Sequence, residues 1–247
     1  MPEVSENRIS DHSVVIRTFP VPEGEDLFAQ VLQQRQLEMV DAPMIEVVAL
    51  LFQLPEAPAH YDWLVFTSKN GIKSWFTRYT KAAHQKIAVL GPSSNEALKA
   101  YGQSADFTGS GHSGSVFAEE FQAVWQGQGS LLLVLGKLAP DVVQETLSRG
   151  TNQPFDSDIH RVDVYETRMP ATINSAAIDR IIQDDYRVIA VSSPSAVHHL
   201  MTLLEPEVAQ LRFASIGSIT SKALRSYGIE PVAEAREQSY SGLARVC

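Results

Sequence analysis

Hydroxyl-rich loops follow four short apolar runs, and their residue types suit the binding of an anion. After WLVF come Thr67, Ser68, Lys69 and Asn70, and after VIAV come Ser192, Ser193 and Ser195. Two further loops open with glycine: Ser93 and Ser94 follow Gly91, and Gly217, Ser218 and Thr220 follow RFASI. A serine or threonine at the start of a helix caps it and leaves neighbouring N–H groups available for a carboxylate or phosphate. Any one loop alone is explained by capping, but four such loops indicate an anion-binding site.

Tyr165, in DVYET, is the most suggestive single residue, because a phenol can donate a proton or a hydrogen bond. Packing of a strand aromatic against a neighbour explains it equally well.

Other kinds of site are disfavoured by the sequence. The seven histidines show no metal-ligand spacing, and the adjacent His198 and His199 point about 100° apart on a helix. Cys247 is the only cysteine, so no cysteine-based metal site is expected. P-loop and GxSxG motifs are missing from the sequence, which argues against an NTP or a serine hydrolase.

The composition is that of a globular protein: 247 residues, 44% of them hydrophobic, with a formal charge of −9. No Lys/Arg run is present, which disfavours a nucleic-acid partner. No window of ~18 to 20 apolar residues predicts a membrane span, and the start MPEVSENRISDHS is polar and acidic rather than signal-like. We expect a cytosolic location.

The elements that must position these side chains alternate between strand and helix. A helical pattern follows each predicted strand. The first predicted helix ends near Gln34 and the second near Tyr79. The predicted strands are SVVIR (13–17), DWLVFTS (62–68), KIAVLG, ADFTG, SLLLVLG, RVIAVSS, RFASIG and EPVAEA. GSGHSGS (109–115) is predicted to be a loop before a helix. Strands separated by helices imply parallel sheets with crossover helices. The fold class is α/β.

An internal repeat relates the loops to one another. VFTSKNGIKSWF (65–76) matches AVSSPSAVHHLM (190–201) at an offset of 125, and GPSSNEALKAYG (91–102) matches GSITSKALRSYG (217–228) at 126. HSGSVFAEEF (112–121) matches QSYSGLARVC (238–247), again at 126. A fixed offset over three consecutive units predicts two copies of one module and therefore two similar domains.

Two β-prone segments interrupt the alternation, LEMVDAPMIEVVAL (37–50) and FDSDIHRVDVYETR (155–168). They could carry the chain into a second domain and back, which would make the first domain discontinuous. A simple tandem split near residue 130 explains the sequence about equally well, and the residues alone leave both arrangements open.

Taken together, WLVFTSKNGIKSWF, IAVLGPSSNEALKAYG, VDVYETR, VIAVSSPSAVHHL and FASIGSITSKALRSYG resemble the uroporphyrinogen-III synthase family in their order, spacing and duplication. The resemblance implies two flavodoxin-like domains joined by a two-stranded β-ladder, with domain 1 at residues 1–41 and 168–247 and domain 2 at 45–165. It further implies a monomer that cyclises hydroxymethylbilane, a linear tetrapyrrole, with loss of water and inversion of ring D, in a cleft between the domains and with no cofactor.

The resemblance also assigns roles to residues. Tyr165 matches the tyrosine proposed to assist departure of the hydroxyl as water, and Thr220 and Ser193 match positions at the cleft. Thr67, Ser68, Ser192 and Ser218 belong to the same loops. Arg17 is a candidate carboxylate partner, although a structural arginine is nearly as well supported. Lys69 stands where the family commonly has proline, and RTFP differs from the family's usual order Thr-Arg-Pro.

The implied chemistry suits this chain because the substrate carries many carboxylates, which match helix N-termini and hydroxyls. An electron-rich pyrrole can expel its own hydroxyl, so the enzyme chiefly has to fix a conformation. The alternative is a non-catalytic two-lobed binding protein for a small anionic ligand, which would not require Tyr165. A pair of signalling receiver domains is disfavoured, since no acidic cluster ends a predicted strand.

Overall fold

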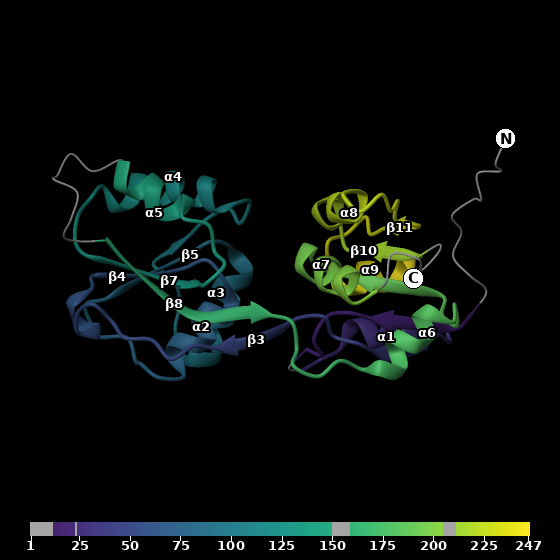
Figure 1. Cartoon of the computed structure of the whole chain (residues 1–247). Coiled ribbons are helices and arrows are strands. Elements are labelled where there is room, and N and C mark those ends of the chain that lie inside the picture. Colours follow the sequence, from purple (N-terminus) through teal and green to yellow (C-terminus); the bar gives the residue numbers. More distant parts are fainter. Residues whose placement is uncertain (1–11, 23, 150–158, 205–210) are drawn as a thin grey trace. The chain divides into compact units, whose positions relative to one another are not determined.

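The computed structural model describes residues 12–22, 24–149, 159–204 and 211–247 and divides into two compact units (Figure 1). Unit 1 comprises residues 1–46 and 168–247, and unit 2 comprises residues 47–167. The first unit is therefore discontinuous, which decides against the tandem split. The predictions made for residues 1–11 and for 155–158 fall outside the described residues.

Unit 1 is built on a parallel sheet with strand order β11-β10-β9-β1-β2. The strands are β1 (Val14–Arg17), β2 (Glu38–Asp41), β9 (Val188–Val191), β10 (Phe213–Ser215) and β11 (Ala233–Glu234). The helices are α1 (Leu27–Gln34), α6 (Ser175–Ile182), α7 (Pro194–Leu203), α8 (Ser218–Arg225) and α9 (Tyr240–Val246). This is the flavodoxin-like strand order, with the switch point between β1 and β9.

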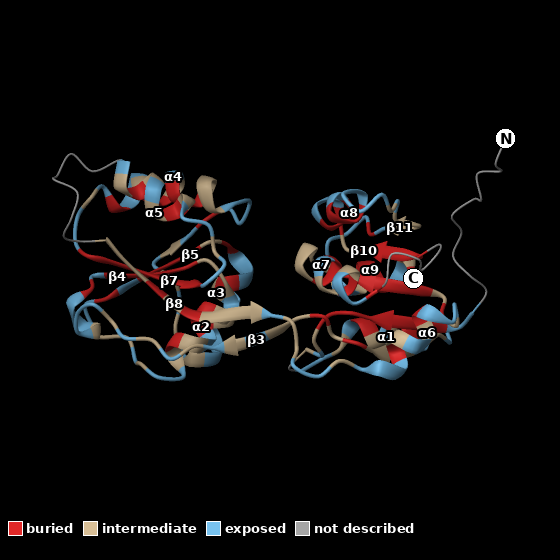
Figure 2. Ribbon diagram, viewed as in Figure 1, coloured by how far each residue is buried: buried red, intermediate tan, exposed pale blue. Residues whose placement is uncertain are grey.

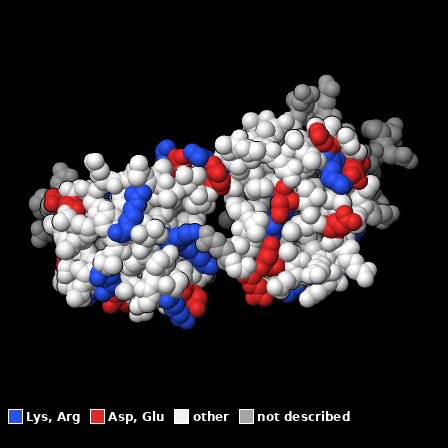
Figure 3. Space-filling model, turned by 90° about the horizontal axis from the view of Figure 1, so that it is seen from below, with Lys and Arg blue, Asp and Glu red and all other residues white. Residues whose placement is uncertain are grey.

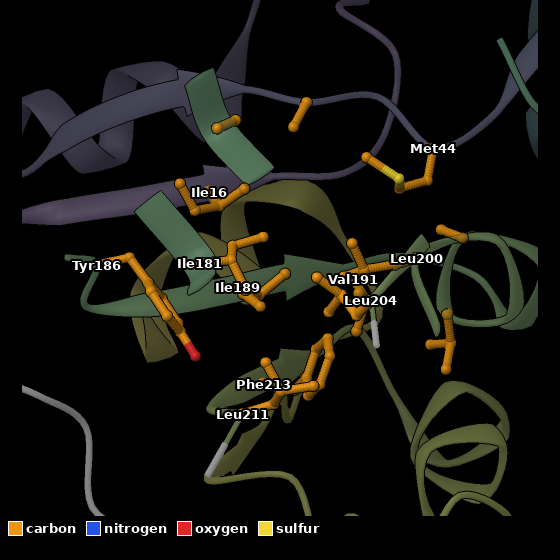
Figure 4. Close-up of a cluster of buried hydrophobic side chains, with 14 of the residues drawn as sticks. Ile16, Met44, Ile181, Tyr186, Ile189, Val191, Leu200, Leu204, Leu211 and Phe213 are labelled. Atoms are coloured by element: carbon orange, nitrogen blue, oxygen red, sulfur yellow. The ribbon is translucent and has the colours of Figure 1, made fainter. Parts of the chain in front are cut away.

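The core of unit 1 follows from the two-residue period of its strands. Val14 and Ile16 pack with α6, α7 and α8 on one face of the sheet, while Val15 packs with α1 and α9 on the other. Figure 4 shows Ile16, Ile181, Ile189, Leu200 and Phe213 converging on the first face. Each such side chain contributes about 1.5 to 3 kcal/mol when fully buried. Figure 2 shows the result, buried strands between helices whose outer faces are exposed.

Unit 2 has a six-stranded sheet of order β3-β8-β7-β4-β5-β6. Its strands are β3 (Glu46–Ala49), β4 (Trp63–Phe66), β5 (Lys86–Val89), β6 (Phe107–Thr108), β7 (Leu131–Gly136) and β8 (Ile159–Arg168). Its α-helices are α2 (Lys69–Phe76), α3 (Pro92–Leu98), α4 (Gly114–Trp125) and α5 (Val142–Arg149), with 3-10 turns at Pro58–His60 and Lys99–Tyr101. Helices α2 and α3 cover one face, and α4 and α5 cover the other.

The internal repeat is visible in the helix caps. Ser68 and Ser193 each cap a helix by accepting the N–H three residues on, and so do Ser113 and Ser239. Gly91 and Gly217 are both N-caps whose helices have no side-chain cap. These pairs are separated by the sequence offsets of 125 and 126, so the duplication is confirmed at the level of backbone geometry.

The duplication also covers strands that the offset does not reach. Reading β6-β5-β4-β7-β8 against β11-β10-β9-β1-β2 gives the same parallel order, so β7 and β8 of unit 2 occupy the places of β1 and β2 of unit 1. The registers agree, because Val15 pairs with Val188 and Met39 as Leu131 pairs with Trp63 and Ile159. Unit 1 is therefore a circular permutation of unit 2, which is why the sequence repeat at a fixed offset begins only at β4.

The two interrupting segments contribute strands to the sheets as well as linking the two units. Residues 37–50 supply β2 to one sheet and β3 to the other. Strand β8 pairs with β7 in parallel, with one register shift near the end of β7, and lies beside β3. The chain passes between the units within β3 and at the end of β8. Glu46 and Arg168, the two residues of unit 1 at these crossings, form an ion pair of 2.8 Å.

Candidate functional site

The loop after β4 places Ser68 at the start of α2. Its Oγ accepts a hydrogen bond of 3.1 Å from the N–H of Gly71, while Thr67 and Asn70 are half-buried and Lys69 is exposed. A Cβ at Gly71 would lie 2.9 Å from the carbonyl oxygen of Val134, so glycine lets this helix start close to β7. The local sequence thus holds the hydroxyl of Ser68 at the carboxyl end of the sheet.

Tyr165 is brought to the same place from β8, 97 residues away. Its Oη donates a hydrogen bond of 3.0 Å to Ser68 Oγ. The register between β7 and β8 shifts at this point: Leu135 pairs with Asp163, but Gly136 pairs with Tyr165. Bulges of this kind re-aim a side chain, and they occur often beside functional sites. The structure therefore joins Tyr165 to the Ser68 loop.

Gly136 provides the surface on which the tyrosine ring lies. A Cβ at Gly136 would be 2.5 Å from Tyr165 Cζ and 2.7 Å from its Oη, distances that no side chain can occupy. Gly136 was not among the candidates from the sequence. The signal that could have found it is a glycine ending an otherwise apolar strand, LLLVLG, because glycine inside a strand often marks a bulge or a close approach.

The two glycine loops differ in how their hydroxyls are exposed. In unit 1, Gly217 precedes exposed Ser218, whereas Thr220 is only 3% exposed. In unit 2, Ser93 is exposed and Ser94, the counterpart of Thr220, is 5% exposed. Among the described residues, none forms a hydrogen bond with the Thr220 hydroxyl. A hydroxyl without a protein partner at an uncapped helix N-terminus is suited to receive a ligand.

The loop after β9 presents Ser192, Ser193 and Ser195, all half-buried. Ser193 Oγ accepts a hydrogen bond of 3.2 Å from Ala196 N–H. The two histidines of α7 point to different partners: His198 Nδ1 lies 2.8 Å from Tyr227 Oη, and His199 Nδ1 lies 2.6 Å from the Met44 carbonyl oxygen. They do not form a ligand pair.

Arg17, the candidate carboxylate partner, is held inside unit 1 by two acidic residues. This residue is 1% exposed, and its guanidinium is held by the carboxylates of Asp26 and Asp41. Burial on its own would raise the pKa of Asp26, but hydrogen bonds from the Ala29 N–H and from Arg17 lower that pKa below its usual value. This arrangement supports the structural reading of Arg17.

Two polar residues near these loops were missed. Lys137 directly follows β7, its N–H donates 2.8 Å to the Tyr165 carbonyl, and its ammonium lies 3.0 Å from Glu166. Gln238 lies over Gly217, with its Nε2 2.7 Å from where a Cβ would stand. Lys137 could have been found by the rule that identified Lys69, namely a polar residue after a buried strand.

Charged side chains of both signs lie on the surface of the protein. Figure 3 shows acidic and basic side chains mixed on the face that it presents. A shallow depression along α5 is lined by Asp141, Gln144, Glu145, Ser148 and Arg149, and it includes none of the candidate residues. Within the described ranges, no cluster of three metal-ligating side chains occurs, and no helix is long and apolar enough to span a membrane.

The fold and these loops define a class: an α/β protein with two related parallel sheets, each presenting hydroxyl groups and helix N-termini at the carboxyl ends of its strands. The particular family follows from comparison with known proteins. The chain belongs to the family described as uroporphyrinogen-III synthase HemD, whose model matches residues 26–245.

Individual relatives agree with this assignment. The chain is 26% identical over 224 residues to the porphyrin biosynthesis protein HemD of Ruminiclostridium josui, a match that covers 85% of this chain and 43% of the relative. The chain thus spans less than half the length of that protein. The crystal structure of uroporphyrinogen-III synthetase from Helicobacter pylori aligns with a TM-score of 0.64 at 15% identity, covering 94% of this chain and 96% of the other. A mutant uroporphyrinogen III synthase from Thermus thermophilus gives 0.58 at 13% identity, covering 94% and 96%. These structures share the fold.

Proposed function

We propose that this protein is a uroporphyrinogen-III synthase, which cyclises hydroxymethylbilane with loss of water and inversion of ring D. Family membership supports a tetrapyrrole substrate. The observation that carries the proposal is the contact between Tyr165 and Ser68, because it sets a phenol and a serine at the carboxyl end of the unit 2 sheet. A protein that only bound anions would have no need of that phenol.

In the proposed reaction, the C–O bond of the hydroxymethyl group breaks while its oxygen takes a proton from Tyr165 and departs as water. The electron pair of the pyrrole nitrogen stabilises the resulting azafulvene-like cation. The cationic carbon bonds to the substituted carbon of ring D and gives a spiro intermediate. The bond from that ring carbon to its original methylene bridge then breaks, the released bridge carbon bonds to the free carbon of the inverted ring D, and the proton lost from that carbon restores the phenol. The hydroxyls of Thr67, Ser192, Ser193, Ser218 and Thr220 and the N–H groups beside them hold carboxylates. Catalysis rests mainly on positioning.

The direct test is to mix the purified protein with freshly made hydroxymethylbilane and to resolve the uroporphyrinogen isomers by chromatography. We expect isomer III. Isomer I alone, the product of spontaneous closure, would show that the protein does not catalyse the reaction. In that case a binding-only function is tested by titrating a stable linear tetrapyrrole polycarboxylate.

Thr220 allows activity and stability to be separated. Thr220→Val keeps the shape of a 3% exposed side chain and removes a hydroxyl for which the described residues provide no partner. We expect a melting temperature equal to or slightly above that of the wild type, because a buried polar group has been removed. We expect kcat/KM to fall by about tenfold, the loss of one hydrogen bond to a charged group.

The matched control is Thr202→Val in the same unit, an exposed threonine whose Oγ1 donates to the His198 carbonyl within α7. It should leave kcat/KM unchanged. If Thr220→Val keeps full activity, its hydroxyl does not contact the substrate. A fall in melting temperature by several degrees would instead indicate that the hydroxyl has a structural partner.

A further inference from the structure

Ser68 caps α2 and also contacts Tyr165, so it has a second structural role. A hydroxyl oxygen has two acceptor positions and one proton to donate. One position of Ser68 Oγ is taken by the Gly71 N–H at 3.1 Å, and the other by the Tyr165 O–H at 3.0 Å. The single proton of the phenol is used in this contact, and it becomes available to a ligand when the two hydroxyls exchange roles and Ser68 donates its own proton to Tyr165 Oη. Ser68 and Tyr165 therefore form one unit, anchored at the N-terminus of a helix.

The opposite side of the tyrosine is fixed as well. Its ring lies against the backbone at Gly136, where a Cβ would approach Cζ to 2.5 Å. The bulge between Leu135 and Gly136 gives Tyr165 its direction, and Ser68 stops the ring from swinging outward. A half-buried tyrosine held at the ring face and at the oxygen has lost most of its rotational freedom before any ligand arrives.

We propose that Ser68 and Gly136 are positioning residues for Tyr165, which fix the phenol oxygen for proton donation to the leaving hydroxyl. This inference rests on the proposed synthase function. Ser193, the counterpart of Ser68 in unit 1, caps α7 in the same way, but among the described residues its Oγ is hydrogen-bonded to the Ala196 N–H and to no tyrosine. Within the part of the chain that the structure describes, the contact between the capping serine and a tyrosine is therefore present in one of the two copies only.

The test measures the tyrosine itself as well as the reaction. 3-Fluorotyrosine is inserted at position 165, and its fluorine NMR resonance is recorded in the wild-type background and in Ser68→Ala, Ser68→Thr and Ser113→Ala. We expect Ser68→Ala to shift or broaden the resonance by more than its linewidth and Ser68→Thr to restore it. Ser113→Ala removes the equivalent cap of α4, and the hydrogen bonds of Ser113 Oγ within the described residues go to Val116 and Ser115 and to no tyrosine. It should leave the resonance unchanged.

In the enzyme assay, Ser68→Ala should lower kcat about tenfold with KM within about twofold, while Ser68→Thr retains most of the activity. Gly136→Ala should shift the fluorine resonance and lower kcat more strongly, because the new methyl group displaces the ring. An unchanged resonance in Ser68→Ala would overturn the proposal, whatever the activity. A shifted resonance in a protein that yields only isomer I would support the positioning contact and refute the synthase function, so the two failures are distinguishable.

Discussion

Tyr165→Phe is expected to lower kcat for formation of uroporphyrinogen III by about a hundredfold, at the lower end of what a positioned proton donor contributes. The ring would keep its place on Gly136, so the fold should tolerate the change. The lost hydrogen bond to Ser68 is a contact of a half-buried group, worth about 0.5 to 1.5 kcal/mol of unfolding free energy. Initial rates with fresh hydroxymethylbilane, the isomer ratio and a urea unfolding curve measure both effects.

Tyr101→Phe is the matched control for that variant. Tyr101 is also half-buried in unit 2, but it stacks on Phe76 at a centroid distance of 5.2 Å at the end of the helical segment after β5. Removal of the Tyr101 hydroxyl should change neither kcat nor the isomer ratio. Full activity of Tyr165→Phe would exclude the phenol as proton donor, and the reaction would then depend on positioning alone.

The largest effect on stability is expected from Arg17→Met. The substitution leaves Asp26 and Asp41 facing an apolar side chain where a buried guanidinium had compensated their charges. Removing one partner of a buried ion pair costs about 3 to 5 kcal/mol, but the two carboxylates are 21% and 42% exposed and can regain water. We therefore expect about 2 to 3 kcal/mol at pH 7, measured by urea unfolding. Arg149→Met, which breaks an exposed pair with Glu145, should cost no more than about 0.5 kcal/mol.

The effect of Arg17→Met should depend on pH in a defined direction. The folded-state pKa of Asp26 is lowered, so the stabilisation by its charged form is present above the unfolded-state pKa of about 3.9 and is lost as the pH falls through the folded value. The difference between wild type and variant should therefore shrink below about pH 4. A difference that stays constant down to about pH 2 would mean that Arg17 stabilises through packing of its aliphatic part rather than through charge.

The parts of the fold that could be predicted are those governed by local pattern. Val14 to Arg17 and Trp63 to Phe66 are continuous apolar or near-apolar runs, and Ser68 and Ser193 are strong helix caps, so strands, helices and their repeat follow from the sequence. The circular permutation does not follow, because strand order depends on long-range pairing. The correspondence of β1 with β7 appears only when both sheets are seen.

The site was predictable by residue type and not by contact. Tyr165 and Ser68 were both candidates, but nothing in the sequence says that they touch, because the contact depends on a register shift between β7 and β8. The contacts of Arg17 could not be predicted either. Its side chain is suited to a ligand carboxylate, and two carboxylates of the protein itself, Asp26 and Asp41, occupy it. Charge pairing inside the protein competes with ligand binding, and the sequence does not show which prevails.

The insertion of one unit into the other imposes an order on folding during synthesis. Unit 2 is a continuous segment and is complete once residue 167 has left the ribosome, whereas β1 and β2 must wait for β9, β10 and β11. At about 5 to 20 residues per second, the 67 residues from 168 to 234 take roughly 3 to 13 s to translate. During that interval β1 and its apolar neighbours have no partner sheet, so the nascent chain depends on the early-folded unit for solubility and exposes its first strands to chaperones.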